Sequence, residues 1–249
     1  MEKNILEENK LKDQLLQVMI DNEGSDMYIT VWAFPAIKIG WEIISINEGI
    51  EKLKWKDTLE FTQSIITETQ HDELMKKKNL DFSFTFWSRR FRANVSFQLS
   101  NYMIVFRLLS SDIPNIEKLN LPDIYKDVTK LGQWLILITG PTGSWKTTTL
   151  ASMIDYVNNT QEKHIITIED PIEYVHDHKR SIMEHKEIWK DVPNYETALM
   201  WAMRQNPDVI FFWEMRTKDE MTMALTLAET GHLVLSTLHT RWAYQTITR

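Results

Sequence analysis

The chain has 249 residues, of which 43% are hydrophobic and 25% are charged, and its formal net charge is -7. This composition is that of a folded protein with room for one large domain or two modest ones, and it excludes a disordered tail. The negative charge argues against non-specific binding to nucleic acid or to an anionic membrane, and the absence of cysteine excludes disulfides and cysteine-held zinc.

The N-terminal segment alternates apolar and charged side chains at helical spacing, which predicts a helix over residues 3–20. It has no continuous apolar core, so it is not a signal peptide. No apolar run in the chain approaches the roughly 18 residues that a membrane-spanning helix needs. We therefore expect a cytoplasmic protein whose membrane association comes only through partners.

The next part of the chain mixes short strands with one helix. Strands are predicted at "MYITV", "AIKI" and "EIISI", a helix around residues 57–78, and further strands at "DFSFTF", "RFRANVSFQL" and "YMIVFRLL". This pattern predicts a small α+β domain over residues 1–112. The polar stretch "SSDIPNIEKLNLPD", with two prolines, predicts a linker, which we place at residues 113–122.

From residue 132 onward the pattern changes to buried strands separated by helix-length segments. The run "WLILIT" leads through a loop into the predicted helix "TTTLASMIDYVNN", and "HIITIED", "DVIFFWE" and "HLVLSTLH" repeat the strand pattern. Strands that alternate with helices predict an α/β domain with a parallel sheet over residues 123–249. The functional site of such a domain lies at the carboxyl ends of the strands.

The loop "GPTGSWKT" matches seven of the eight positions of the phosphate-binding pattern G-x-x-x-x-G-K-[ST]. In that pattern backbone amides surround the phosphates, the lysine contacts the β- and γ-phosphates, and the hydroxyl after it binds Mg²⁺. A chance glycine- and threonine-rich turn is the alternative. The residues expected to bind ATP are Gly140, Pro141, Thr142, Gly143, Ser144, Trp145, Lys146, Thr147 and Thr148.

Carboxylates follow two of the predicted strands. Glu169 and Asp170 end one strand and Glu173 comes one turn later, where they would hold metal or polarise water, or would cap a helix. Glu214 follows another strand, where it would orient an attacking water or form an ion pair with Arg216. The metal site is expected to comprise Thr147, Glu169 and Asp170.

Histidines and arginines supply the remaining candidates. His232 and His239 flank a buried run, where they would sense a γ-phosphate or satisfy local hydrogen bonds. The first domain carries a basic cluster that would be a solvated face or would complete the phosphate site of a neighbouring chain. Its members are Arg89, Arg90, Arg92 and Arg107.

These motifs together resemble the secretion ATPase superfamily, and within it the PilT-like retraction ATPases of type IV pili. The resemblance runs from about Ser25 to the last residue, through "RFRANV", "ITIEDPIEYVH", "NPDVIFFWEMR" and "AETGHLVLSTLHT". It implies a PAS-like domain before a RecA-like P-loop core, assembled as a homo-hexameric ATPase that uses Mg²⁺ and powers pilus retraction and twitching motility. It also implies an inner-membrane platform protein as partner and a location at the inner face of the cytoplasmic membrane.

The resemblance also assigns roles by residue type. Lys146 and Thr147 match the P-loop pair, and Glu214 matches the catalytic glutamate. His232 and His239 match the histidine box. The acidic box is matched by Glu169, Asp170 and Glu173. The strand arginines that reach nucleotide in such rings are matched by Arg89, Arg90 and Arg92. The short first domain and the missing cysteines favour this branch over pilus-extension ATPases.

Tryptophan stands where the family shows glycine or another small residue. The chain has 7 glycines and 10 tryptophans. The family-glycine positions are Trp32, Trp41, Trp87, Trp134, Trp145, Trp189 and Trp213, and the small-residue positions are Trp201 and Trp242. Our hypothesis is that the source reads UGA as glycine. The chain also ends sooner than the family does, so a fragment is expected.

If the tryptophans are literal, different outcomes are expected. An indole at Trp145 would occupy the phosphate space, and Trp41 and Trp87 would strain turns at about 1 to 3 kcal/mol each. The chain would then be poorly folded and inactive. A ring or scaffold subunit without turnover is the alternative function, and a nucleic-acid translocase is a third, which the acidic composition disfavours.

Overall fold

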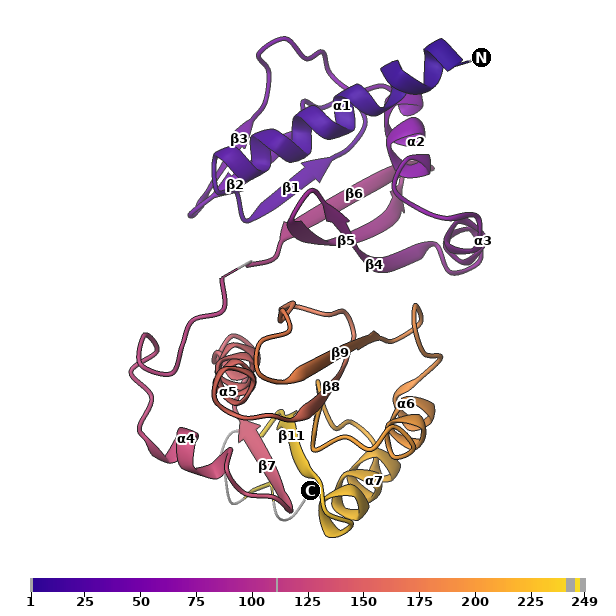
Figure 1. The fold of residues 1–249 in the computed structure, drawn as a ribbon. Helices are drawn as coiled ribbons and strands as arrows, with labels where there is room; N and C mark the ends of the chain where they lie inside the picture. The colour runs from indigo at the N-terminus through magenta and orange to yellow at the C-terminus, as the bar shows by residue number, and fades with distance from the viewer. Residues whose placement is uncertain (1, 111, 241–244, 247–249) are drawn as a thin grey trace. The chain divides into compact units, whose positions relative to one another are not determined.

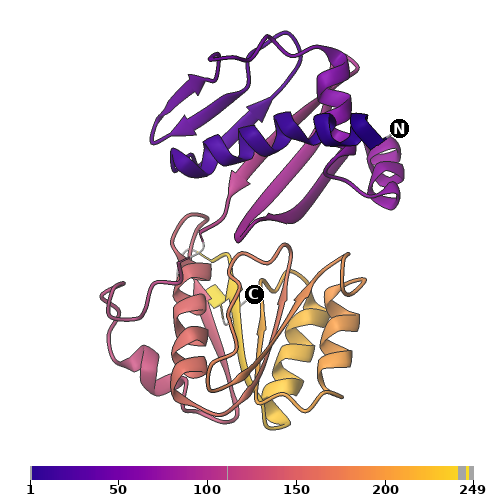
Figure 2. The same ribbon diagram turned by 45° about the horizontal axis from the view of Figure 1, so that its top comes forward.

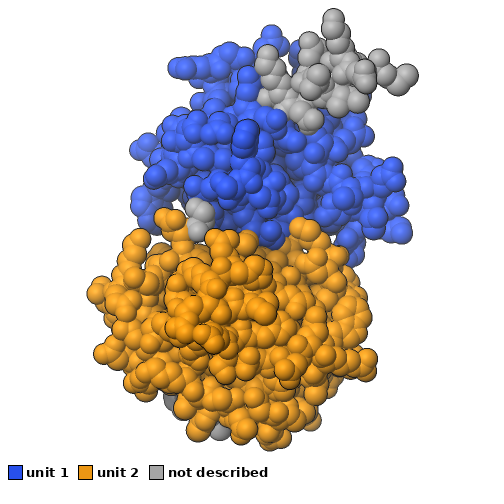
Figure 3. Space-filling view, in the orientation of Figure 1, with its two compact units in different colours: residues 1–110 blue, residues 111–249 orange. Residues whose placement is uncertain are grey.

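The computed structural model describes residues 2–110, 112–240 and 245–246, and of residues 2–10 only the backbone. Trp242 lies outside the described residues. The chain divides into two compact units, residues 1–110 and 111–249 (Figure 3). No helix in the described part of the chain has both the length and the apolar character for crossing a membrane.

Unit 1 is a six-stranded antiparallel sheet with helices packed on it. The strands lie in the order β3-β2-β1-β6-β5-β4 (Figure 1). They are β1 (Asp26–Ile29), β2 (Ala36–Ile39), β3 (Glu42–Ser45), β4 (Asn79–Phe86), β5 (Arg89–Gln98) and β6 (Asn101–Leu108). Leu15 and Met19 of α1 (Glu2–Asp21) and Phe61 of α2 (Trp55–Gln63) pack on the buried face beside Phe91 and Phe106. This confirms the α+β prediction.

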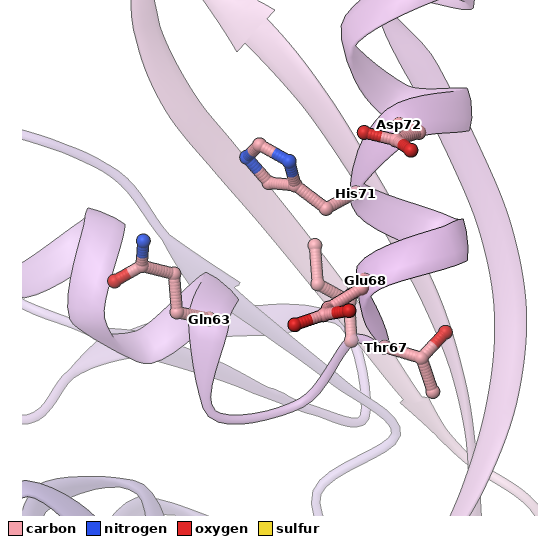
Figure 4. Close-up of a pocket in the computed structure, with 6 residues that line it drawn as sticks. Gln63, Thr67, Glu68, His71 and Asp72 are labelled. Carbon is pink, nitrogen blue, oxygen red and sulfur yellow. The ribbon is translucent and has the colours of Figure 1, made fainter.

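The helix predicted around residues 57–78 is wrong as a single element, because the structure has α2 (Trp55–Gln63) and α3 (Glu68–Lys77) there. Thr67 begins α3: its hydroxyl accepts from the Gln70 amide, and the Gln70 side chain accepts from the Thr67 amide. This capping box stabilises a new helix start. A pocket of about 460 Å³ lies at the break, with Gln63 on the α2 side and Glu68 and His71 on the α3 side (Figure 4).

Unit 2 is a five-stranded sheet with every neighbouring pair parallel, in the order β7-β11-β10-β8-β9. The strands are β7 (Trp134–Thr139), β8 (His164–Glu169), β9 (Ile182–Glu187), β10 (Val209–Phe212) and β11 (Leu233–Leu238), and the helices are α4 (Ile124–Val128), α5 (Lys146–Thr160), α6 (Tyr195–Ala202) and α7 (Lys218–Glu229). The predicted parallel α/β fold is confirmed.

The two faces of this sheet are covered by different helices. Along β10, Val209 and Phe211 pack with Leu150 and Val157 of α5, whereas Ile210 and Phe212 pack with α6 and α7. Figure 2 shows the sheet between α5 and the α6–α7 pair. Because strands alternate their side chains, strands buried on both faces must be apolar at successive positions, as the continuous runs predict.

Candidate nucleotide-binding site

The loop between β7 and α5 lies at the carboxyl end of the parallel sheet, where the sequence predicts the site. The Gly140 amide donates to Leu238 O at 3.3 Å, which ties the loop to the end of β11. A Cβ at Gly140 would lie 2.6 Å from Ser144 Oγ, and Gly143 has φ +79°. These two positions therefore need glycine, one for close approach and the other for its left-handed backbone.

Lys146 places its ammonium group inside the curve of this loop. Nζ donates to Gly140 O at 3.0 Å and to Pro141 O at 2.9 Å. Burial lowers the pKa of Lys146, and the nearby negative charge of Glu214 opposes that shift. A bound phosphate oxygen would replace these two neutral carbonyl acceptors with a charged acceptor. The hydrogen bond from a lysine to a charged acceptor is the stronger one.

Trp145 is the N-cap of α5 and has left-handed backbone angles, φ 62° and ψ 23°. Its side chain is 72% exposed, so the indole gains little burial there. A residue with a Cβ in this conformation costs about 1 to 2 kcal/mol relative to glycine. The backbone at position 145 thus has the form that glycine adopts most easily.

Of the predicted metal residues, the structure places Thr147 in the first turn of α5 and Glu169 and Asp170 at the end of β8. Glu169 is buried, and its Oε2 accepts from the Glu173 amide at 3.2 Å. Helix capping does not explain these carboxylates, because residues 170–181 form an irregular connector. Among the described residues, no three histidine, aspartate or glutamate side chains gather as ligands of one metal.

Glu214 contacts Arg216, as one of the two predictions has it, and also His239. Its Oε2 accepts from Arg216 Nε at 3.0 Å, and its Oε1 lies 3.5 Å from His239 Nε2. The predicted ion pair with Arg216 therefore exists. The side chain of Glu214 is only 14% exposed, so Arg216 and His239 contact a largely buried carboxylate.

The structure does not bring His232 to this site. His232 precedes β11, and its Nδ1 contacts Leu227 O at 2.8 Å. His239 follows the same strand, so the two residues are separated by about 23 Å at 3.3 Å per residue. Within one chain, His232 therefore makes a local hydrogen bond and does not reach the nucleotide-binding loop.

The arginines of β5 do not form one cluster. Arg90 and Arg92 lie on the face opposite the core, and Arg92 is directly across from Arg107, which pairs with Asp26 at 2.9 Å. Arg89 has the parity of the buried Phe91, and its buried Nε has no hydrogen-bond partner among the described residues. Arg89 and Arg92 therefore point to opposite faces, a difference that follows from strand alternation.

The comparisons with known proteins agree with this geometry. The family model described as type II/IV secretion system protein matches residues 87–249. The chain belongs to this family. Family members from Pseudomonas aeruginosa include the type IV pilus retraction ATPase PilT, 38% identical over 95% of the chain and 68% of the relative, and the type IV pilus ATPase PilU, 35% identical over 95% and 62%.

Other relatives extend the same result. A twitching motility protein of Neisseria gonorrhoeae is 38% identical over 86% of the chain and 57% of the relative. The crystal structure of the pilus retraction motor PilT with bound ADP superposes with a TM-score of 0.91 at 43% identity, covering 95% of this chain and 69% of that one. The chain thus spans about 57% to 69% of the lengths of these proteins.

Proposed function

We propose that the chain is an ATP-hydrolysing subunit of a motor that retracts type IV pili and drives twitching motility. The observation that carries the proposal is that the loop holding Lys146 and the carboxylate of Glu214 both meet the end of β11: the Gly140 amide donates to Leu238 O, and Glu214 Oε1 lies 3.5 Å from His239 Nε2. The names of the relatives, a retraction ATPase and a twitching motility protein, support the biological role.

In this proposal Lys146 and the loop amides bind the β- and γ-phosphates of ATP, and Glu214 orients the attacking water. Arg216 and His239 hold the Glu214 carboxylate in place. Thr147 and the buried Glu169 fit magnesium, which proteins usually hold with one or two oxygens beside phosphates and waters. Magnesium supplies charge neutralisation on the phosphates when it is bound.

We also propose that the native protein has glycine at the tryptophan positions, because its source reads UGA as glycine. Positive φ is uncommon for residues other than glycine and an outlier for bulky ones. Four of the seven family-glycine tryptophans nevertheless have it, namely Trp32 (60°), Trp87 (54°), Trp145 (62°) and Trp189 (67°). All four side chains are exposed, so packing does not compensate for the strain.

Mass spectrometry of the protein from its source cells tests the decoding. Cleavage after Lys130 and Lys146 releases one peptide with both Trp134 and Trp145. We expect the mass of this peptide to be lower than that of the printed sequence by two tryptophan-to-glycine replacements. A peptide with the mass of the printed sequence contradicts it.

Two substitutions in the W145G chain test the catalytic assignment. Glu214→Gln is expected to retain nucleotide binding and to lose hydrolysis by about a hundredfold or more, because the water loses its orienting carboxylate. Lys146→Ala is expected to lose binding itself. Equal hydrolysis by Glu214→Gln and its parent would refute the role of Glu214.

The strained Trp145 favours one alternative: with a literal tryptophan, the chain would be a ring or scaffold subunit without turnover. Binding of nucleotide by the W145G chain with no hydrolysis would support that function.

We also propose a PAS-like first domain over residues 1–112, a linker over 113–122 and a RecA-like core over 123–249. The proposed assembly is a homo-hexamer in the cytoplasm that meets the membrane through a platform protein.

A further inference from the structure

The connector between β8 and β9, residues 170–181, lies along the phosphate-loop helix α5. Asn158 is fully buried, and its Nδ2 donates to Asp177 O at 2.7 Å. The Lys179 amide donates to Asn158 Oδ1 at 3.2 Å, and Lys179 Nζ lies 2.7 Å from Asp155 Oδ1. These contacts fix the connector against the second half of α5.

At the other end of this contact, Tyr174 reaches the first turn of α5. Its hydroxyl lies 3.1 Å from Thr148 Oγ1, within hydrogen-bond distance. Thr148 is buried and follows directly after the predicted magnesium ligand Thr147. Tyr174 therefore contacts the residue that directly follows the phosphate-binding loop, although the sequence motifs assign Tyr174 no role.

The bond of Thr148 differs from those of five other threonines within or at the end of helices. A threonine within a helix can donate to the carbonyl four residues earlier. Thr62, Thr160, Thr222, Thr226 and Thr230 all do so, at 2.7 to 2.9 Å. Thr148 lies in the first turn of α5, and the carbonyl four residues earlier belongs to Ser144, which precedes the N-cap Trp145, so the helix offers Thr148 no such acceptor. Tyr174 provides a partner for the hydroxyl from outside the loop.

We propose that Tyr174 is a positioning residue for nucleotide binding, acting through the Thr148 hydroxyl. This inference rests on the proposed function. Tyr174 is the hydrogen-bond partner of that hydroxyl and links the first turn of α5 to the segment that carries Glu169 and Glu173. Loss of one such hydrogen bond is expected to weaken nucleotide binding about threefold to tenfold.

The test measures the Kd of a fluorescent ADP for variants of the W145G chain. Tyr174→Phe is expected to raise Kd by that factor with an unchanged melting temperature, whereas Tyr156→Phe, two turns further along α5, leaves Kd unchanged. The Thr148→Val variant removes the bonding partner, so adding Tyr174→Phe to it is expected to cause no further loss. Thr148→Ser is expected to restore the sensitivity to Tyr174→Phe.

The outcomes separate the two proposals. If W145G binds ADP and Tyr174→Phe binds equally well, the positioning role is refuted and the proposed function stands. A Tyr174→Phe loss that persists in full on the Thr148→Val background refutes action through Thr148. If W145G and W145G/Lys146→Ala bind ADP equally poorly, both proposals fail.

Discussion

At the scale of single residues, two hairpin loops of unit 1 allow a matched comparison of glycine and tryptophan. The loop between β2 and β3 is Gly40-Trp41, and that between β4 and β5 is Trp87-Ser88. In both loops the first residue has positive φ, 59° at Gly40 and 54° at Trp87. The expectation that Trp41 strains its turn is therefore wrong, because Gly40 takes the left-handed position, whereas the same expectation holds for Trp87.

Trp87→Gly is expected to raise the free energy of unfolding by about 1 kcal/mol, because it relieves the left-handed strain. Trp41 is also exposed but has no positive φ, so Trp41→Gly is expected to give no such gain. Urea unfolding of both variants measures the difference. Equal stabilisation by the two substitutions would contradict the role of backbone strain.

A second prediction at this scale concerns acid stability. His176 and then Lys179 lower the pKa of Asp155 to about 2, against burial, which acts in the opposite direction. The unfolded carboxyl has a pKa of about 3.9, so the unfolded state takes up the proton first as pH falls. The stability from Asp155 is present above about pH 4 and is lost as pH falls toward 2.

Asp155→Asn is therefore expected to destabilise the chain at pH 7 and to have a smaller effect near pH 2. Urea unfolding at both pH values checks this, with the exposed Asp72→Asn as control. A destabilisation by Asp155→Asn that is the same at both pH values would show that charge is not the cause.

At the scale of elements, the capping box at Thr67 decides where α3 begins. Thr67→Ala is expected to lower the free energy of unfolding by about 1 kcal/mol, because the hydroxyl no longer accepts from the Gln70 amide. Thr67→Ser keeps the acceptor and is expected to retain most of the stability. Thermal unfolding compares the two, and an equal loss in both would exclude capping as the reason.

The strands of unit 2 differ in how far the sequence predicts them. β8, β10 and β11 are mainly apolar and are buried on both faces, whereas β7 is a mainly apolar edge strand that is only half-buried; the apolar runs alone locate all four. The sequence does not predict β9, because this strand lies at the other edge and has charged side chains. Lys186 is nevertheless buried, since its Nζ contacts Glu184 Oε1 at 3.0 Å and Gln205 Oε1 at 2.7 Å. Pairing between distant segments stabilises such charges, and no local pattern encodes it.

The site shows the same limit. The loop from Gly140 to Thr147 is a local pattern, so the sequence locates it directly. The separation of His232 from His239 and the opposite faces of Arg89 and Arg92 depend on strand direction and register, which only the assembled sheet fixes. The contact between Tyr174 and Thr148 joins residues 26 positions apart and likewise needs the fold.

At the scale of the whole molecule, the division at residue 110 follows the change from mixed short strands to buried parallel strands. Unit 2 contains the loop, Lys146, Glu214 and His239 in one contiguous chain segment. Nucleotide binding is therefore a property expected of unit 2, and we expect it to depend on the residue at position 145.

Equilibrium binding of fluorescent ADP to the chain with Trp145 and to W145G measures this dependence. Glycine adopts the left-handed backbone at position 145 without strain and leaves the loop amides accessible to phosphate. We expect W145G to bind at least about tenfold more tightly, which corresponds to about 1.4 kcal/mol. Equal affinity of the two chains would contradict it.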